Sequence, residues 1–205
     1  MEQEPETEVA AIDRDLSVDG TRTVATISRS YDTDVEDLWE ACTTADRLAR
    51  WFAPVSGALE LGGRYQIEGN AGGTVTRCDK PDAFRVTWEF GDQVSDLVVT
   101  FTADGPDRSR LTLTHSADVD PEFWERYGPG ATGVGWDLAL AGLAGHVSTG
   151  RDVRQEGLEW AASEAGRRFM TASSTAWADR SIAAGTPQDA ARAAEARTTA
   201  FYLGG

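Results

Sequence analysis

The sequence has few of the residues that build metal centres and disulfide frameworks. Its 205 residues include two histidines and two cysteines, Cys42 and Cys78. Two isolated cysteines give neither a disulfide framework nor the ligand spacing of a zinc site. We therefore expect no metal site, and the reduced thiols favour a cytoplasmic location.

Long apolar runs and basic surfaces are also missing. No apolar run approaches the ~20 residues needed to cross a bilayer, and residues 1–8 lack the basic and apolar parts of a signal peptide. The net charge is -15, from 34 acidic and 19 basic residues. This charge would repel phosphate backbones and anionic membrane surfaces. We expect neither nucleic acid nor membrane as a partner, while a basic protein partner stays open.

The chain is instead rich in aromatic residues and in strand-like alternation. It contains seven tryptophans and seven phenylalanines. From residue 59 onward, apolar residues recur at every second position and glycine-rich turns separate the segments. Such short connections favour antiparallel pairing, because parallel strands need long crossovers. The predicted strands cover about 64–68, 74–78, 84–90, 97–101 and 111–115, after a first strand at 23–30.

Helical patterns lie before and after these strands. The acids at 32–34 are suitable N-caps for a helix with Val35, Leu38 and Trp39 on one face. A second short helix is predicted at about 45–51, before Pro54 ends it. After a short helical turn at 121–127, Trp136 opens a long helix with apolar residues at spacings of four, three and four.

The two ends of the chain differ from the middle. The first ten residues carry four repelling glutamates and are predicted to be disordered. The tail is predicted to form one helix over about 158–182 and a second, alanine-rich helix that ends at about Tyr202. Thr186 is the predicted N-cap of the second helix. The alanine-rich helix must lean on another element or fray. We divide the chain into an acidic, partly disordered N-terminus (1–20), a central domain (21–150) and a helical C-terminal extension (151–205).

Several motifs in this order resemble the SRPBCC superfamily (START-like, birch pollen allergen-like), most closely its Hsp-90 ATPase activator homologue-like branch. The resemblance covers about residues 23–147. The motifs are Leu-Ala-Arg-Trp-Phe-Ala-Pro at 48–54, Gly-Gly-Arg-Tyr at 62–65, Val-Thr-Trp-Glu at 86–89, Leu-Thr-Leu-Thr-His-Ser at 111–116 and Gly-Trp at 135–136.

The resemblance implies an α+β helix-grip fold, in which an antiparallel sheet wraps around a long C-terminal helix. An additional helical C-terminal extension follows here. Members of the superfamily usually bind hydrophobic small molecules, some bind proteins, and some relatives are polyketide cyclases or hydroxylating subunits. The branch has no universal catalytic residues, so no catalytic residue and no cofactor are assigned.

The predicted ligand site lies between the sheet and the Trp136 helix. An apolar space with few polar groups is the usual character of a ligand site. Within it, His115 is either a satisfied core histidine or a polar anchor or base. The sequence cannot distinguish a filled interior from an open one. The candidate ligand-binding residues are Trp51, Tyr65, Trp88, Phe101, His115, Trp136 and Leu140.

Three further features have less specific interpretations. Residues 128–133 match G-x-G-x-x-G, but no strand leads directly into them, so a dinucleotide site is not favoured. We interpret them as a flexible loop at the cavity mouth. Arg77 is either a surface residue or an inward guanidinium that meets a carboxylate ligand. His146 is predicted to lie on the helix surface.

Three functions remain open. The first is a non-enzymatic protein that binds a small, mostly hydrophobic molecule. The second is a protein-interaction or co-chaperone-like module, in which residues 151–205 complete a homodimer or present a partner surface. The third and least favoured is a cyclase or aromatase-type enzyme with His115 as its base.

Overall fold

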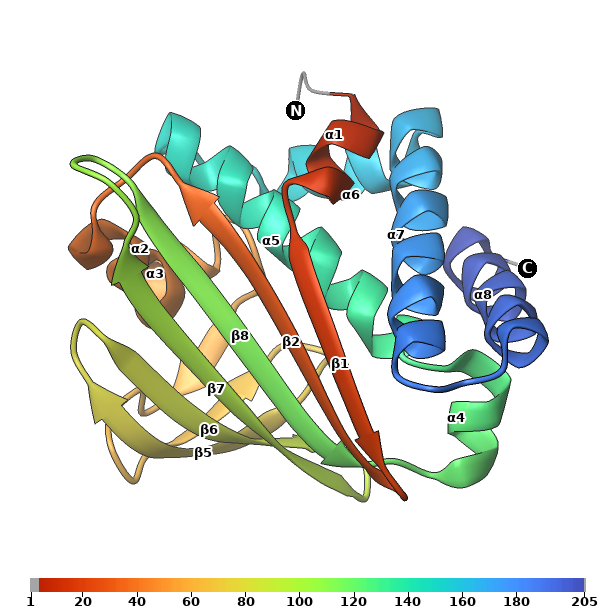
Figure 1. Cartoon of the computed structure of the whole chain (residues 1–205). Helices are drawn as coiled ribbons and strands as arrows, with labels where there is room; N and C mark the ends of the chain where they lie inside the picture. The colour runs from red at the N-terminus through yellow and green to blue at the C-terminus, as the bar shows by residue number, and fades with distance from the viewer. Residues whose placement is uncertain (1–3, 205) are drawn as a thin grey trace.

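The computed structural model describes residues 4–204, which form one sheet and a set of helices (Figure 1). All pairings in the sheet are antiparallel, in the order β1-β2-β8-β7-β6-β5-β4-β3. The strands are β1 (Asp13–Asp19), β2 (Arg22–Tyr31), β3 (Val55–Gly57), β4 (Arg64–Ile67), β5 (Gly72–Asp79), β6 (Ala83–Phe90), β7 (Gln93–Ala103) and β8 (Ser109–Asp118). The helices are α1 (Pro5–Ala10), α2 (Val35–Thr43), α3 (Ala45–Leu48), α4 (Pro121–Tyr127), α5 (Gly130–Thr149), α6 (Arg154–Ala162), α7 (Glu164–Ala183) and α8 (Gln188–Leu203).

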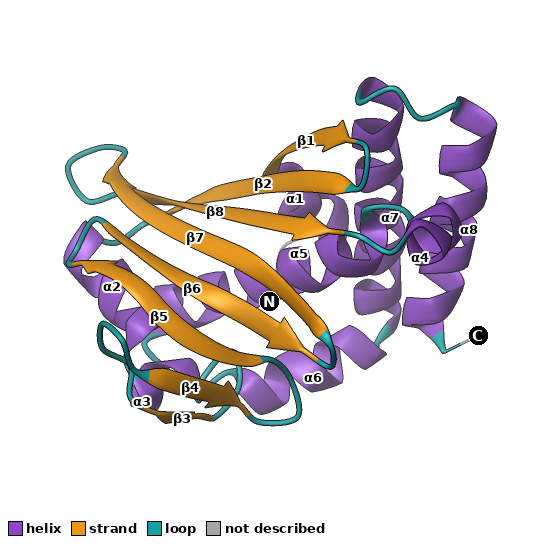
Figure 2. Cartoon of the chain, turned by 90° about the horizontal axis from the view of Figure 1, so that it is seen from below, coloured by secondary structure: helices purple, strands orange, loops and turns teal. Residues whose placement is uncertain are grey.

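The sheet curves over α5, with α2 and α3 on the same side (Figure 2). Pairing of β7 with β8 places Leu97 opposite His115 and Val99 opposite Leu113. Because side chains alternate along a strand, these residues share the concave face. The Tyr31 hydroxyl donates to the Leu140 carbonyl at 3.2 Å and fastens β2 to α5. The α+β helix-grip fold is therefore confirmed, including the helical extension after the long helix.

The start of α2 follows the predicted capping chemistry. The Asp34 side chain accepts a hydrogen bond from the Asp37 backbone N–H at 2.7 Å. Such a bond satisfies one of the free donors of the first helical turn. Inside α2, Leu38 is fully buried and Trp39 is 4% exposed. These residues turn the predicted apolar face toward the sheet.

The N-terminus is more ordered than predicted. Residues 5–10 form α1 and residues 13–19 form β1, which pairs along its whole length with β2. The predicted disorder is wrong for these residues, because their acids meet distant arginines instead of repelling one another. Glu8 accepts from Arg29 at 2.8 Å in the interior, and Glu6 accepts from Arg168 of α7 at 2.7 Å. Residues 1–3 lie outside the described part of the chain.

Most of the glycine-rich stretch at 128–133 is helix and not a flexible loop at the cavity mouth. Helix α5 already begins at Gly130. A Cβ on Gly133 would lie 2.2 Å from Trp177 Cε2, and a Cβ on Gly130 would lie 3.0 Å from Thr198 Cγ2. The glycines therefore permit close packing of α5 against α7 and α8, and the interpretation as a flexible loop is wrong.

The tail helices pack onto the body of the protein. The predicted helix at 158–182 is two helices, because Ser163 ends α6 and accepts from the Gly166 N–H as the N-cap of α7. Helix α8 packs against α4 and α5, which gives its alanine-rich sequence the support that it needs to stay helical. The Thr198 hydroxyl donates to the Tyr127 carbonyl, and the Tyr202 hydroxyl donates to the Ala131 carbonyl.

The N-cap of α8 differs from the predicted one. Its N-cap residue is Pro187, with no side-chain cap. Thr186 does not cap the helix, because its hydroxyl instead accepts from Ser181 at the end of α7. This bond ties the connection between α7 and α8 to α7.

A buried ion pair joins the N-terminal strand, the long helix and the tail. Arg14 of β1 donates through Nε to Asp137 Oδ2 of α5 at 2.9 Å, and the carboxylate side chain is fully buried. The same oxygen accepts from Ser173 at 2.5 Å and from Trp177 Nε1 at 3.1 Å. Asp137 Oδ1 has no hydrogen-bond partner among the described residues. One carboxylate oxygen thus holds three segments that are distant in sequence.

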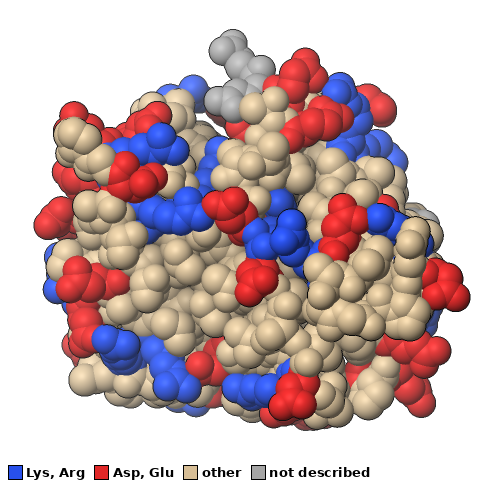
Figure 3. Space-filling model, in the orientation of Figure 1, with Lys and Arg blue, Asp and Glu red and all other residues tan. Residues whose placement is uncertain are grey.

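Charged side chains of both signs are dispersed over the face drawn in Figure 3, around an uncharged central area. Threonine and serine occupy many outward positions of β2, β7 and β8, with Thr26 opposite Thr114 and Ser28 opposite Thr112. Within residues 4–204, no helix has both the length and the apolar character to cross a membrane. The cytoplasmic location stays a prediction.

Candidate ligand cavity

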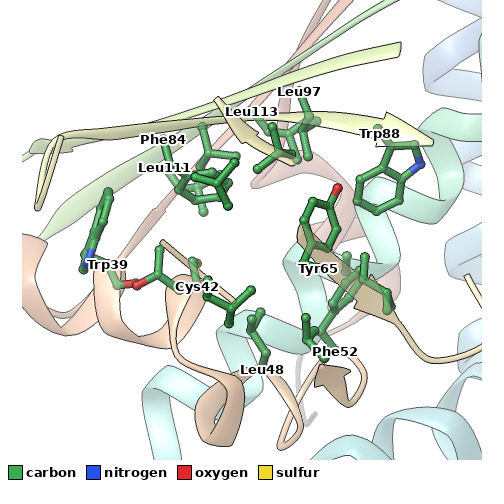
Figure 4. A pocket seen from close by; sticks show the side chains of 18 of the residues that line it. Trp39, Cys42, Leu48, Phe52, Tyr65, Phe84, Trp88, Leu97, Leu111 and Leu113 are labelled. Atoms are coloured by element: carbon green, nitrogen blue, oxygen red, sulfur yellow. The ribbon is translucent and has the colours of Figure 1, made fainter. Parts of the chain in front are cut away.

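A cavity of about 310 Å³ lies between the concave face of the sheet and the helices α2, α3 and α5 (Figure 4). Strands β6, β7 and β8 form one wall, which includes Phe84, Leu97 and Leu113. The α2–α3 segment forms the facing wall, which includes Trp39 and Leu48. The lining is almost entirely apolar, so the cavity can exclude water from a small molecule.

Five of the seven candidate residues line this cavity: Trp51, Tyr65, Trp88, Trp136 and Leu140. The other two do not. Phe101 is 2% exposed and packs behind the wall, with its ring centroid 5.5 Å from Trp39 and 6.1 Å from Phe84. His115 lies behind Trp88 and Trp136, at ring-centroid distances of 6.4 and 5.8 Å.

Both ring nitrogens of His115 are already hydrogen-bonded. The Trp136 indole N–H donates to Nδ1 at 3.2 Å, so this nitrogen carries a lone pair and not a proton. The proton therefore sits on Nε2, which donates to the Ser95 hydroxyl at 2.7 Å. The Ser95 hydroxyl in turn donates to the Trp88 carbonyl at 3.2 Å. Burial lowers the pKa of His115 from 6.5 to about 4, which keeps the ring neutral.

The hydroxyl of Tyr65 is also engaged. It donates to the Thr87 carbonyl at 2.8 Å, and burial raises the pKa of Tyr65 to about 12. The ring therefore presents a neutral, mostly apolar surface to the cavity. Cys42 lines the α2 side, and burial raises the pKa of its thiol far above its ordinary value. A protonated thiol is a poor nucleophile, so Cys42 serves as a packing residue.

Sequence reasoning missed most of the α2–α3 wall. Cys42, Leu48 and Phe52 line the cavity, and the helical periodicity gave no sign of which helix residues would face a void. The sheet wall had a usable signal, because Leu97, Val99, Leu111 and Leu113 share the strand parity of the residues predicted to face the helix.

The structure also shows where Arg77 and His146 lie. Arg77 is a surface residue, and its Nε donates to Asp79 at 2.5 Å. His146 is fully buried, so its predicted surface position is wrong. Its Nε2 accepts from Arg47 Nε at 2.7 Å, and its Nδ1 donates to the Arg151 carbonyl at 2.6 Å. These bonds fasten α3 and the start of the tail to α5.

Residues 32–148 match the family model described as Activator of Hsp90 ATPase homolog 1-like protein. The match spans more than half of the sequence. The chain belongs to this family. The matched residues include α2, α3, all of α5 but its last residue and every strand from β3 to β8, which together enclose the cavity. No curated protein matches the chain.

Solved structures share the fold of this chain. The crystal structure of CalU16 from Micromonospora echinospora is 26% identical, with a TM-score of 0.65 over 83% of this chain and 98% of CalU16. The solution structure of CalU16 gives a TM-score of 0.69 at 25% identity, over 85% and 97% of the two chains. The Aha1 dimer from Colwellia psychrerythraea is 15% identical, with a TM-score of 0.52 over 61% and 96%, and shows the shared fold alone.

Proposed function

We propose that the protein binds a small, mostly hydrophobic molecule in the cavity between the sheet and α5. The observation that carries the proposal is a cavity of about 310 Å³ whose walls are mostly aliphatic and aromatic side chains. This volume is at the lower end of the ~300–1,000 Å³ typical of ligand pockets. Burial of apolar ligand surface would contribute about 25 cal/mol per Å², before the cost of immobilising the ligand is subtracted.

Native mass spectrometry of the full chain, purified from the cells that produce it, tests this proposal. A retained molecule should appear as a discrete mass increment that organic solvent removes. Protein stripped in this way should then take up one equivalent of an uncharged apolar probe such as decanol. The proposal fails if no molecule is retained and the stripped protein does not take up the probe.

A surface aromatic cluster favours a protein-interaction module as the second candidate. Tyr127 of α4 packs against Phe123 of the same helix and against Phe201 of α8, at ring-centroid distances of 5.1 and 5.8 Å. Phe123 is 48% exposed and Phe201 is 59% exposed. Exposed aromatic side chains are enriched in protein interfaces. Light scattering of the wild type and of a Phe123→Ser, Phe201→Ser double variant tests this role, because loss of a dimeric mass in the variant alone would support it.

An enzyme with His115 as its base receives no support from the geometry. A general base needs a free lone pair within reach of the substrate proton. The Nδ1 lone pair of His115 accepts from Trp136, and Nε2 holds the proton. A His115→Gln variant should therefore retain any turnover that a cyclase assay detects.

A further inference from the structure

The mouth of the cavity is marked by two residues. Among the residues that line the cavity, Cys78 and Lys80 are exposed, while the others are buried or half-buried. Cys78 lies near the end of β5, and Lys80 lies in the turn between β5 and β6. These exposed side chains place an opening of the cavity at this end. The mouth lies between this turn and the C-terminal half of α2, which contributes Cys42 and Thr43.

Lys80 is the one charged side chain in the lining, and it is also the single lysine of the sequence. The other 18 cationic residues are arginines. A lysine side chain lays its methylene stem along apolar surface and holds a compact ammonium group in water. At the mouth, this stem extends the apolar wall, and an ammonium group in this position can meet the polar head of a bound molecule.

The charge of Lys80 is only loosely compensated. Its ion-pair partner among the described residues is Glu40 of α2, with Nζ 3.7 Å from Oε1, and both side chains are more than half exposed. The neighbouring Asp79 is already paired with Arg77. Exposed pairs at such distances are weak because water screens them. A carboxylate brought to the mouth by its own apolar body can therefore displace Glu40 at little cost.

We infer that the cavity selects amphipathic monocarboxylic acids, with the apolar body inside and the carboxylate paired with Lys80 at the mouth. This inference rests on the proposed binding function and names its ligand class. The net charge of the chain is -15, so the electrostatic potential of the whole protein disfavours the binding of an anion. Selection for an acid therefore depends on the local ammonium group of Lys80.

The test compares decanoate, decanol and decylamine, which share one chain length and differ in the charge of the head group. Quenching of the tryptophans in the lining reports binding at low salt. The wild type should bind decanoate more tightly than decanol, and decylamine most weakly. Lys80→Gln should weaken decanoate binding by about two- to fivefold and leave decanol binding unchanged, because an exposed ion pair contributes modestly. In 1 M salt the wild type should also lose its preference, since the screening length falls to about 3 Å.

Arg77→Gln is the matched control. It removes one positive charge from β5, the strand that leads into the Lys80 turn, at an exposed position that does not line the cavity. Decanoate binding should be unchanged in this variant. Selective acetylation gives a second readout, because Lys80 and the α-amino group are the amines of the chain. Decanoate should slow the acetylation of Lys80 relative to that of the α-amino group.

The outcomes separate the two proposals. Equal affinities for decanoate and decanol, or an unchanged preference in Lys80→Gln, would overturn the acid selection and leave the binding function standing. Equal losses in Lys80→Gln and Arg77→Gln would also overturn it, because the effect would then belong to overall charge. If the wild type binds none of the three molecules, both proposals fail.

Discussion

Gly133 of α5 and Trp177 of α7 approach so closely that a methyl group on Gly133 would lie 2.2 Å from the indole Cε2. Trp177 is fully buried, and its indole N–H donates to Asp137 one turn further along α5. The tail is therefore fastened to the same helix that lines the cavity with Trp136, Ala139 and Leu140. Residues 151–204 therefore take part in the packing around α5.

Gly133→Ala should destabilise the protein strongly. The added Cβ cannot be accommodated without moving Trp177, and overpacking of this kind typically costs about 1–3 kcal/mol. Gly157→Ala is the matched control, because Gly157 lies inside α6 and a Cβ there meets no atom within 4 Å. That change should stabilise the protein by about 0.5–1 kcal/mol. Urea unfolding of both variants measures the difference, and equal effects would contradict the packing described.

Asp137→Ala should cost about 3–5 kcal/mol of unfolding free energy, because it leaves the buried Arg14 without its partner. The combined variant Arg14→Met, Asp137→Leu should recover much of this loss, since both charges are then removed. Glu6→Gln breaks the exposed contact with Arg168 and should change stability far less. Denaturant titration of the three variants tests the account. A double variant no more stable than Asp137→Ala would show that the loss does not come from the stranded arginine.

The burial of His115 predicts a specific pH dependence. Its pKa is lowered from 6.5 to about 4 in the folded protein, so the unfolded chain takes up the proton first as the pH falls. The stabilisation is complete above pH 6.5 and is lost progressively toward pH 4. Between pH 7 and pH 5 this loss amounts to about 2 kcal/mol.

His115→Gln removes the titrating group and should remove this part of the pH dependence. Because carboxylates also titrate at low pH, the quantity to compare is the difference in unfolding free energy between wild type and variant at pH 7 and at pH 5. That difference should shrink by about 2 kcal/mol on acidification. A constant difference would mean that His115 is not held neutral.

Deletion of residues 151–205 should yield an unstable or aggregating protein. Trp177 and Phe169 are both fully buried, and their removal exposes the apolar surface of α5 beneath them. Trp177→Ala is a milder change that should cost about 3–5 kcal/mol. Light scattering and circular dichroism of the truncated chain check this expectation. A folded, soluble truncated monomer would instead show that the tail is dispensable for the central domain.

The sheet could be predicted from the sequence, because the patterns that specify it lie within short segments of the chain. Alternation at every second residue assigns Leu97, Val99 and Leu113 to one face, and short turns require antiparallel pairing. The N-terminal helix could not be predicted, because its stability depends on contacts that are distant in sequence. Glu8 pairs with Arg29, 21 residues away, and Glu6 pairs with Arg168, 162 residues away. Local composition shows only the repelling acids.

The candidate site was predicted in part for a similar reason. Trp136 and Leu140 follow from the helical period, and Trp88 follows from the strand period. The void itself depends on how far α5 and α2 stand from the sheet, which is set by packing between distant segments. The glycines before Trp136 were misread because glycine permits both a flexible loop and close helix packing. Only the position of Trp177 decides between these two roles.

Binding of an uncharged apolar molecule by the wild type and by Val86→Phe tests the central claim most directly. Val86 lines the cavity, so a phenylalanine ring there would fill space that a ligand needs. Decanol, followed by tryptophan quenching, should bind the wild type with one saturable site. Val86→Phe should weaken this binding about tenfold, the equivalent of about two displaced methylene groups, whereas Val94→Phe at a 66% exposed position should not change it. Absence of saturable binding to the wild type, or equal binding to both variants, would contradict a ligand site in the cavity.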